Sequence, residues 1–237
     1  MRKPAAFFPI VLALGAIILA PQTGAQAQDA QEGPTEIEKC RTISQPGSYK
    51  LVNNLVAGTG DCLVITAGFV TIDLAGFTIT GTAGQNTGIA ARPSTTGGAI
   101  RALAVRNGSI SGFGAGVDLD SAEGSIVEGL RVFGDGLASH DGIIASGIVK
   151  GNTVLSIFGT GMSATGTVTG NYVAFSRFTQ IEIGQGSTVI GNSAGPGADV
   201  GILVSCPSNL TDNTATGNLT NLVLNGEGCH NEDNLAP

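Results

Sequence analysis

The sequence contains no tryptophan, two tyrosines and two histidines, and only 12% of its 237 residues are charged. Without tryptophan and with so little tyrosine, a sugar-binding platform built from these large aromatic rings is not expected. Basic residues are also few, 11 against 18 acidic residues. A chain with this balance lacks the basic surface that binds phosphate backbones, so nucleic acid is not an expected partner.

Long apolar runs are confined to the amino terminus. Residues 1–27 combine a basic start at Arg2 and Lys3, an apolar stretch that contains Pro9, and a small-residue end at Ala25-Gln-Ala27. This pattern predicts a signal peptide, whose removal leaves 9 basic and 18 acidic residues, a formal charge of −9. No later run reaches the roughly 20 apolar residues of a spanning helix. We therefore expect a secreted or periplasmic protein without a transmembrane segment.

The sequence is rich in glycine, with 37 residues, and contains an eight-residue unit that recurs along most of its length. The clearest copy is Val149-Lys-Gly-Asn-Thr-Val-Leu-Ser156, whose first and sixth positions are apolar and are separated by small polar residues. This pattern indicates a strand, a tight turn and a second strand. The first positions of the copies are Leu74, Val105, Val127, Val149, Val168, Val189 and Leu210, at steps of 31, 22, 22, 19, 21 and 21 residues.

A further apolar strand follows each copy, as in Gly142-Ile-Ile-Ala145, so each repeat is expected to hold two or three strands. Such repeats predict about eight rungs stacked into a solenoid, with strands of adjacent rungs paired in parallel about 4.8 Å apart. Equivalent residues of successive rungs then form columns. The fourth position of the unit predicts a hydrogen-bonded amide ladder. Its members are Asn152, Asn171, Asn192 and Asn213.

The second position of the unit alternates in charge through Arg106, Glu128 and Lys150. Opposite charges stacked on neighbouring strands stabilise the pairing and help to set its register. We therefore interpret this column as structural.

The four cysteines test the period independently. Cys40 and Cys62 are 22 residues apart, and Cys206 and Cys229 are 23 apart, so each spacing equals one rung. Stacked positions have nearly the Cα separation of a disulfide, which predicts the bridges Cys40–Cys62 and Cys206–Cys229. The expected organisation is a polar segment or cap at 28–39, one solenoid domain at 40–229 and a polar tail at 230–237. Within the cap, Thr35-Glu-Ile-Glu38 is predicted to start a short helix.

Over roughly residues 40–229 the chain resembles the right-handed parallel β-helix superfamily, which includes pectate lyases, polygalacturonases and alginate epimerases. The resemblance rests on the Val-x-Gly-Asn rungs at 149, 168 and 189 and on Pro46-Gly-Ser-Tyr-Lys-Leu51 followed by the segment 71–81. It implies a polysaccharide ligand held along one outer sheet, bordered by loops that interrupt the rungs. The sequence lacks the Gly-His-Gly and paired aspartates of polygalacturonases and the Asp-Pro-His-Glu of alginate epimerases.

One enlarged loop, Asp135-Gly-Leu-Ala-Ser-His-Asp141, gathers titratable residues between two strands. The candidate catalytic residues are His140, Asp141, Asp118 and Arg131, and Asp135 and Asp120 are candidate substrate contacts. In a lyase or epimerase, His140 would be the base and Arg131 would stabilise the developing negative charge. Alternatively, Asp118 and Asp141 would form the acid and base pair of a glycosidase or would bind Ca²⁺.

A different interpretation takes the aspartates of this loop as ordinary turn residues beside glycine. The protein is then a secreted, disulfide-capped solenoid without catalytic activity or cofactor, which binds polysaccharide or another cell-surface component. This non-catalytic interpretation is the preferred prediction, and an enzyme acting on an acidic polysaccharide is the alternative.

Overall fold

The computed structural model describes residues 33–82, 86–93, 99–134 and 141–237. The chain divides into two units, residues 1–32 and 33–237, and the predicted signal peptide lies in the first, outside the described residues. The described residues form 25 strands and no helix. The described residues therefore contain no helix that is long and apolar enough to span a bilayer.

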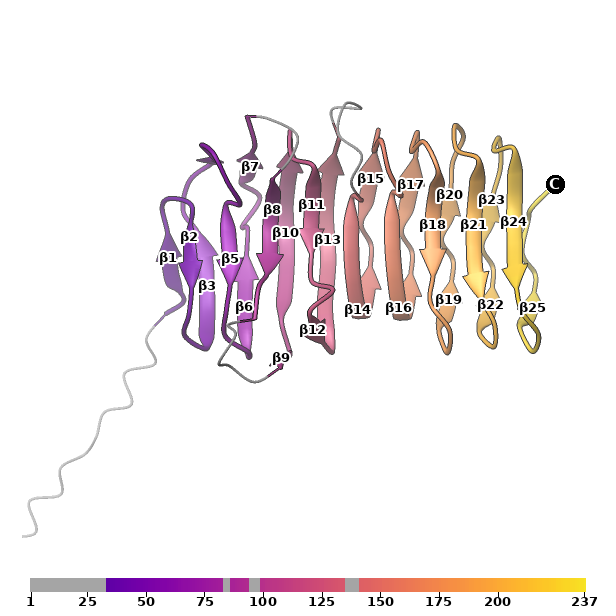
Figure 1. Ribbon diagram of the computed structural model, residues 1–237, viewed down its shortest axis with the longest axis horizontal. Helices are drawn as coiled ribbons and strands as arrows, with labels where there is room; N and C mark the ends of the chain where they lie inside the picture. Colours follow the sequence, from indigo (N-terminus) through magenta and orange to yellow (C-terminus); the bar gives the residue numbers. More distant parts are fainter. Residues whose placement is uncertain (1–32, 83–85, 94–98, 135–140) are drawn as a thin grey trace, which may run out of the picture. The chain divides into compact units, whose positions relative to one another are not determined.

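The strands of residues 33–237 form one solenoid (Figure 1). It has three faces, and the strands within each face are parallel. The long strands β10 (Ala104–Ser111), β13 (Ser125–Phe133), β14 (Ile143–Lys150) and β16 (Met162–Thr169) each bend from one face to the next. Face 1 contains β2 (Arg41–Ile43), β5 (Leu63–Ile65), β8 (Thr87–Ala91), β11 (Ala115–Asp118), the first halves of β14 and β16, β18 (Thr179–Ile183), β21 (Val200–Ser205) and β24 (Thr220–Asn225).

Face 2 contains β1 (Thr35–Ile37), β3 (Gly47–Leu51), β6 (Val70–Asp73), the first halves of β10 and β13, the second halves of β14 and β16, β19 (Thr188–Ile190), β22 (Asn209–Thr211) and β25 (His230–Glu232). Face 3 contains β4 (Leu55–Val56), β7 (Thr78–Thr80), the second halves of β10 and β13, β15 (Thr153–Leu155), β17 (Tyr172–Ala174), β20 (Ser193–Ala194) and β23 (Thr214–Ala215). A separate small sheet pairs β9 (Ile100–Arg101) with β12 (Ala122–Glu123).

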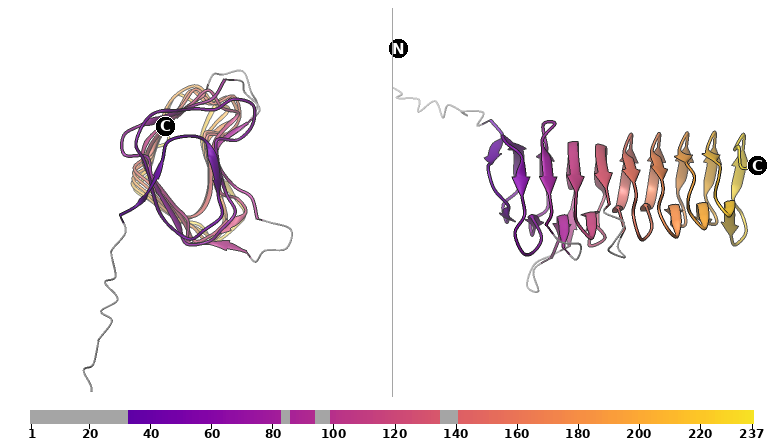
Figure 2. Two further views of the ribbon diagram at one scale, coloured as in Figure 1. Left: turned by 90° about the vertical axis from the view of Figure 1, so that its left-hand side faces the viewer. Right: turned by 90° about the horizontal axis from the view of Figure 1, so that it is seen from above.

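The predicted vertical stacking is confirmed. One inward column of face 2 passes from Tyr49 through Ile72, Val105, Val127, Val149, Val168, Val189 and Leu210 to Asn231. Its eight steps of 19 to 33 residues define eight complete turns. Seen along the axis, these turns superimpose (Figure 2), and their inward side chains form one continuous core. The right-handed sense implied by the family resemblance stays a prediction.

The first rung of the predicted repeat was placed wrongly, because Leu74 is not the partner of Val105. Ile72 pairs with Val105 and Thr78 pairs with Ser109. The connection between the face 2 strand and the face 3 strand is therefore two residues longer in this rung than in the next one. Leu74 is nevertheless fully buried, and it lies so close to Gly108 that no side chain fits there. The glycine of one rung thus makes room for the extra leucine of the rung before it.

The predicted capping helix at Thr35–Glu38 is also wrong. Thr35–Ile37 is a strand, β1, which pairs in parallel with β3 through Ile37 and Leu51. Ile37 is fully buried while Thr35 and Glu36 are exposed. Burying Ile37 on the core is what favours the strand, since a helix of this length would leave it in solvent. Strands therefore occur on both sides of the expected domain limits, β1 before residue 40 and β25 after residue 229.

The predicted amide ladder is confirmed and is longer than expected. In each step, one Asn Oδ1 accepts hydrogen bonds from the backbone N–H and the Nδ2–H of the Asn one rung before it, at 2.7–3.0 Å. Each Nδ2 also donates to a backbone carbonyl of the preceding rung, as Asn171 does to Val149 at 2.9 Å. Asn234 adds a fifth member at the carboxyl-terminal end, and the Leu130 N–H begins the series.

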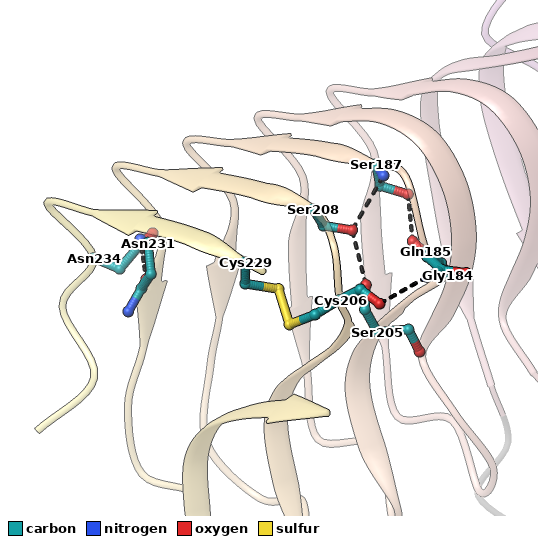
Figure 3. The surroundings of a disulfide bond; sticks show 9 residues. All are labelled: Gly184, Gln185, Ser187, Ser205, Cys206, Ser208, Cys229, Asn231 and Asn234. Carbon is teal, nitrogen blue, oxygen red and sulfur yellow. Dashed lines mark hydrogen bonds between the residues drawn. A yellow bond between two sulfur atoms is a disulfide. The ribbon is translucent and has the colours of Figure 1, made fainter. Parts of the chain in front are cut away.

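Both predicted disulfides are present. Cys40 and Cys62 have Cα atoms 4.5 Å apart, and Cys206 and Cys229 have theirs 5.0 Å apart, as expected for residues one rung apart. The second bridge lies beside a short serine ladder, in which Ser208 Oγ accepts from the Ser187 N–H and donates to the Ser205 carbonyl (Figure 3). Each bridge therefore ties a terminal rung to its neighbour.

We predict that Asn171→Ala lowers the free energy of unfolding by about 4 kcal/mol, because four buried polar groups each lose a partner worth about 1 kcal/mol. These groups are the Asn152 N–H, the Asn152 Nδ2–H, the Val149 carbonyl and the Asn192 Oδ1. Denaturant unfolding measures the change. Asn209→Ala is the matched control, because Asn209 is exposed, and it should stay within about 0.5 kcal/mol of the wild type. Equal losses in both variants would contradict a specific ladder.

Candidate functional site

Asp118, a predicted catalytic residue, is engaged by an arginine. It is the last residue of β11 on face 1, and its Oδ2 lies 2.5 Å from Arg92 Nη1. Arg92 Nη2 also lies 3.6 Å from Asp61 Oδ2, one rung earlier. The Asp118 Oδ1 accepts the Asp120 N–H at 3.2 Å, which is a local turn contact. Arg92 therefore joins two carboxylates across three successive rungs.

Asp141 has a structural partner as well. Its Oδ1 accepts the Thr160 N–H at 2.9 Å. Asp61 makes the equivalent bond to the Thr87 N–H at 2.7 Å, also one rung onward at the start of face 1. The register places Asp141 one rung from Asp118 and three residues earlier along the strand, so their Cα atoms are about 11 Å apart.

Of the other predicted site residues that the structure describes, Asp120 lies beside Asp118 and Arg131 lies on a different face. Arg131 lies on face 3, between Ser109 and Thr153, and its side chain is exposed. Asp135 and His140 lie outside the described residues, so the pairing of His140 with Arg131 stays a prediction. The described part of the chain contains no group of three His, Cys, Asp or Glu side chains suited to a metal ion, and therefore none that includes Asp118 and Asp141.

The alternating charges form a longer column than predicted. It runs through Glu36, Lys50, Asp73, Arg106, Glu128 and Lys150, which are successive partners on face 2. Lys150 Nζ lies 3.2 Å from Glu128 Oε1, and both side chains are half exposed. Each of the four inner members has an opposite charge on both sides, which favours this register. The column is therefore explained by the stability of the solenoid.

A group of aromatic side chains lies at the turn from face 3 to face 1, and we call it the aromatic corner. It consists of Tyr172, Phe175, Phe178 and Phe158, together with Arg177. Phe175 is 57% exposed, Phe178 45% and Tyr172 39%. The Arg177 Cζ lies 4.4 Å from the centre of the Phe158 ring, one rung earlier, and 5.4 Å from that of Phe178. The guanidinium is thus in cation–π contact with two rings.

Glycines of the next rung leave space for two of these rings. A Cβ atom at Gly195 would approach the Tyr172 hydroxyl to 3.1 Å, and one at Gly197 would approach Phe175 Cδ1 to 3.5 Å. The Tyr172 hydroxyl and the Phe175 ring therefore both lie over the segment 195–197. Their exposed sides form an apolar surface that follows the corner of the solenoid.

Phe175 adopts a backbone conformation that is unfavourable for a bulky residue. Its φ is 60°, in the left-handed region, as is the φ of Gly112 at 73°, Ser156 at 59° and Gly217 at 74° at the same corner of other rungs. A side chain in this region costs roughly 1–2 kcal/mol, and glycine avoids most of that cost. Phe69 is also exposed with a φ of 57°, but it belongs to another turn and no ring contact is recorded for it among the described residues. At residue 175 the same strained conformation carries a largely exposed ring.

The charge of Arg177 is not neutralised by a carboxylate of the described residues. Asp199 occupies the next rung, where its N–H donates to the Arg177 carbonyl at 3.3 Å, yet no ion pair joins the two side chains. The guanidinium instead contacts Phe158 of the rung before. The aromatic corner thus combines apolar ring faces with an exposed cation whose N–H groups suit carboxylates and hydroxyls.

The sequence reasoning missed this corner. Tryptophan and tyrosine were considered as sugar-binding residues but phenylalanine was not, and the corner is a turn of ordinary length rather than an enlarged loop. The available signal was Phe175-Ser-Arg-Phe178, two aromatic residues and a cation at a turn where other rungs carry small residues such as Gly112 and Gly217. Only the register shows that Phe158 joins them.

Comparisons with models of protein families, with curated proteins and with solved structures find no match. The class of the protein is therefore defined by its fold, an all-β parallel solenoid of about eight turns with a disulfide near each end.

We predict that Phe175→Asn raises the free energy of unfolding by about 1 kcal/mol, because asparagine tolerates a positive φ and the lost ring is largely exposed. Thermal and denaturant unfolding measure the change. Phe178→Asn is the matched control, since Phe178 is similarly exposed but has no positive φ, and it should not stabilise the protein. A loss of stability in both variants would show that the Phe175 ring is needed for folding.

Proposed function

We propose that the mature protein is a secreted, non-catalytic solenoid that binds polysaccharide at the aromatic corner. The observation that carries this proposal is the exposed Phe175 ring on a strained backbone, in the same turn as Phe178 and Arg177, whose guanidinium has no carboxylate partner among the described residues. Local strain of this kind is retained where a side chain serves binding rather than packing. Secretion is supported by the two disulfides and by the leader pattern of residues 1–27.

The chemistry of the corner suits a sugar chain. The face of a sugar ring presents weakly positive C–H groups, and these stack on the negative face of an aromatic ring. The phenylalanine rings offer such faces, and Arg177 and the Tyr172 hydroxyl supply hydrogen bonds that orient the ligand. Because the rungs stack about 4.8 Å apart, the elements of the corner are arranged along the axis, where an extended polymer makes repeated contacts.

The enzymatic alternative has less support. Asp118 is held by Arg92, and Asp141 has the same backbone contact as Asp61. Both contacts explain the aspartates as parts of the fold. An acidic polysaccharide remains a natural ligand for the non-catalytic protein, because a guanidinium binds a uronate carboxylate through two parallel hydrogen bonds.

We predict that the mature protein binds at least one polymer in a panel of neutral and acidic polysaccharides, measured by retardation in gels that contain each polymer. Phe175→Ala combined with Phe178→Ala should weaken that binding about tenfold or more, because each ring contributes roughly 0.5–1.5 kcal/mol. Phe69→Ala is the matched control, since it removes another exposed ring with a positive φ and should leave binding unchanged.

The same incubations test the enzymatic alternative. Unsaturated ends, new reducing ends or C5 inversion that disappear in His140→Ala or Asp141→Ala would replace the proposal by an enzyme. Absence of binding across the panel, or equal losses in the double variant and in Phe69→Ala, would remove the aromatic corner as the polysaccharide site.

A further inference from the structure

At the carboxyl-terminal end of face 1 the chain's last residues reach only the start of the final strand, where the Pro237 carbonyl accepts the Asn221 Nδ2–H. The last strand there, β24, pairs with β21 on one side, and no described strand pairs with its other side (Figure 1). Its inward residues are partly uncovered. Leu224 is 38% exposed and Leu222 is half-buried, whereas Ile202 and Val204, their counterparts one rung earlier, are 1% and 0% exposed. Apolar core positions therefore reach solvent along a free strand edge.

Two other end strands carry polar residues in the core columns. On face 2, the last strand β25 carries Asn231 in the column that holds Leu210 one rung earlier. At the amino-terminal end of face 1, Arg41 of β2 stands in the column of Leu63 and is exposed. Terminal rungs of solenoids are normally capped in this way, since an apolar end would associate. β24 departs from that rule.

The sequence of β24 offers none of the usual protection of an edge strand. Thr220-Asn-Leu-Val-Leu-Asn225 contains no charge, no proline and no glycine, although the mature chain has a formal charge of −9. Natural edge strands usually carry lysine, proline or a bulge that prevents pairing with another chain. The segment is also symmetric, because Asn221-Leu222-Val223 is mirrored by Leu224 and Asn225 about Val223.

We propose that the free edge of β24 is the interface of a two-fold symmetric dimer, in which two copies of the chain meet tail to tail. A two-fold axis through Val223 pairs the two strands antiparallel, so that Leu222 lies opposite the partner subunit's Leu224, and Asn221 opposite the partner subunit's Asn225. The leucines then continue the core from one solenoid to the other. The backbone groups of both edges are satisfied in the same step.

A head-to-tail stack is disfavoured by charge. Continuing the face 1 column from Leu222 into the amino-terminal end of another copy would set Arg41 over that leucine. The cation would lose water without gaining a carboxylate, which costs several kcal/mol. Tail-to-tail pairing sets uncharged strand against uncharged strand. It also continues the strand pairing and the core that already join the rungs within one chain.

The size of the end face is compatible with a dimer. A rung of 21 residues has a perimeter of about 70 Å at about 3.3 Å per residue, so the end of the solenoid with its side chains covers roughly 650 Å². Specific interfaces bury about 600 to 1,000 Å² per partner. The exposed Leu219 and Leu235, in the last rung, add apolar surface at this end.

Sedimentation of the mature, disulfide-bonded protein at micromolar concentration should give twice the monomer mass. Val223→Lys places two like charges opposite each other across the axis and should give the monomer. Leu203→Lys is the matched control, because Leu203 is the partner of Val223 one rung inward and points outward in the same column. It should remain a dimer. The next position of that column is the exposed Glu182, so a charge is compatible with the fold.

Val223→Cys tests the geometry. All four native cysteines are in disulfides, so the new thiol has only its own copy as a partner. Directly opposite residues of antiparallel strands have Cα atoms about 4.5–5.5 Å apart, within the range of a disulfide. Mild oxidation should crosslink most of the protein into a dimer that reductant separates. A monomeric wild type, a dimer that Val223→Lys does not dissociate, or a dimer that Val223→Cys does not crosslink would each overturn the proposal.

Discussion

Parallel hydrogen bonding between rungs holds every side chain over its counterpart, and the other features of the fold depend on this registration. Because residues about 21 positions apart become neighbours, a residue type that recurs at that period becomes a continuous stripe of one chemistry. Valine and isoleucine in an inward column build the core. Asparagine in the column of Asn171 satisfies backbone groups at the tight turn, where strand pairing alone would leave them without partners. Opposite charges stacked on face 2 stabilise the observed pairing of the strands, because a pairing that set like charges opposite each other would be destabilised.

The same registration explains what could be predicted from the sequence. The period, the columns and both disulfides follow from spacing alone, since a stacked neighbour is set by counting residues. Counting fails where a turn changes length without changing the pattern, as at Leu74, where an additional apolar residue fits because Gly108 has no side chain. It also fails at the end of the solenoid, because a three-residue strand such as β1 carries no period, and only its pairing with β3 makes Ile37 a core residue.

The candidate site was harder to predict because carboxylates in this fold can also have structural partners. Asp118 and Asp141 were predicted as site residues because they are carboxylates near an enlarged loop. Each has a partner on a neighbouring rung, Arg92 for Asp118 and the Thr160 N–H for Asp141. An aspartate at a rung edge can satisfy a backbone N–H of the next rung, which requires no ligand. The aromatic corner has the opposite character, since nothing in the stacking requires a phenylalanine at residue 175 and the backbone conformation there opposes it. This departure from the repeat is the reason that the proposed binding site is placed at the aromatic corner.

The free edge of β24 follows from the same reasoning applied to the end of the solenoid. A rung is stable because both of its neighbours cover it, so the last rung must be covered by something else or must replace its apolar residues by polar ones. Face 2 takes the second course with Asn231, and face 1 does not, because Leu222 and Leu224 keep the inward pattern of the rungs before them. Leucines at that edge lower the solubility of a monomer and contribute nothing to its own core beyond their partial burial. Their presence is accounted for when a second copy of the strand supplies the missing neighbour, since each copy then stands in the place of the next rung.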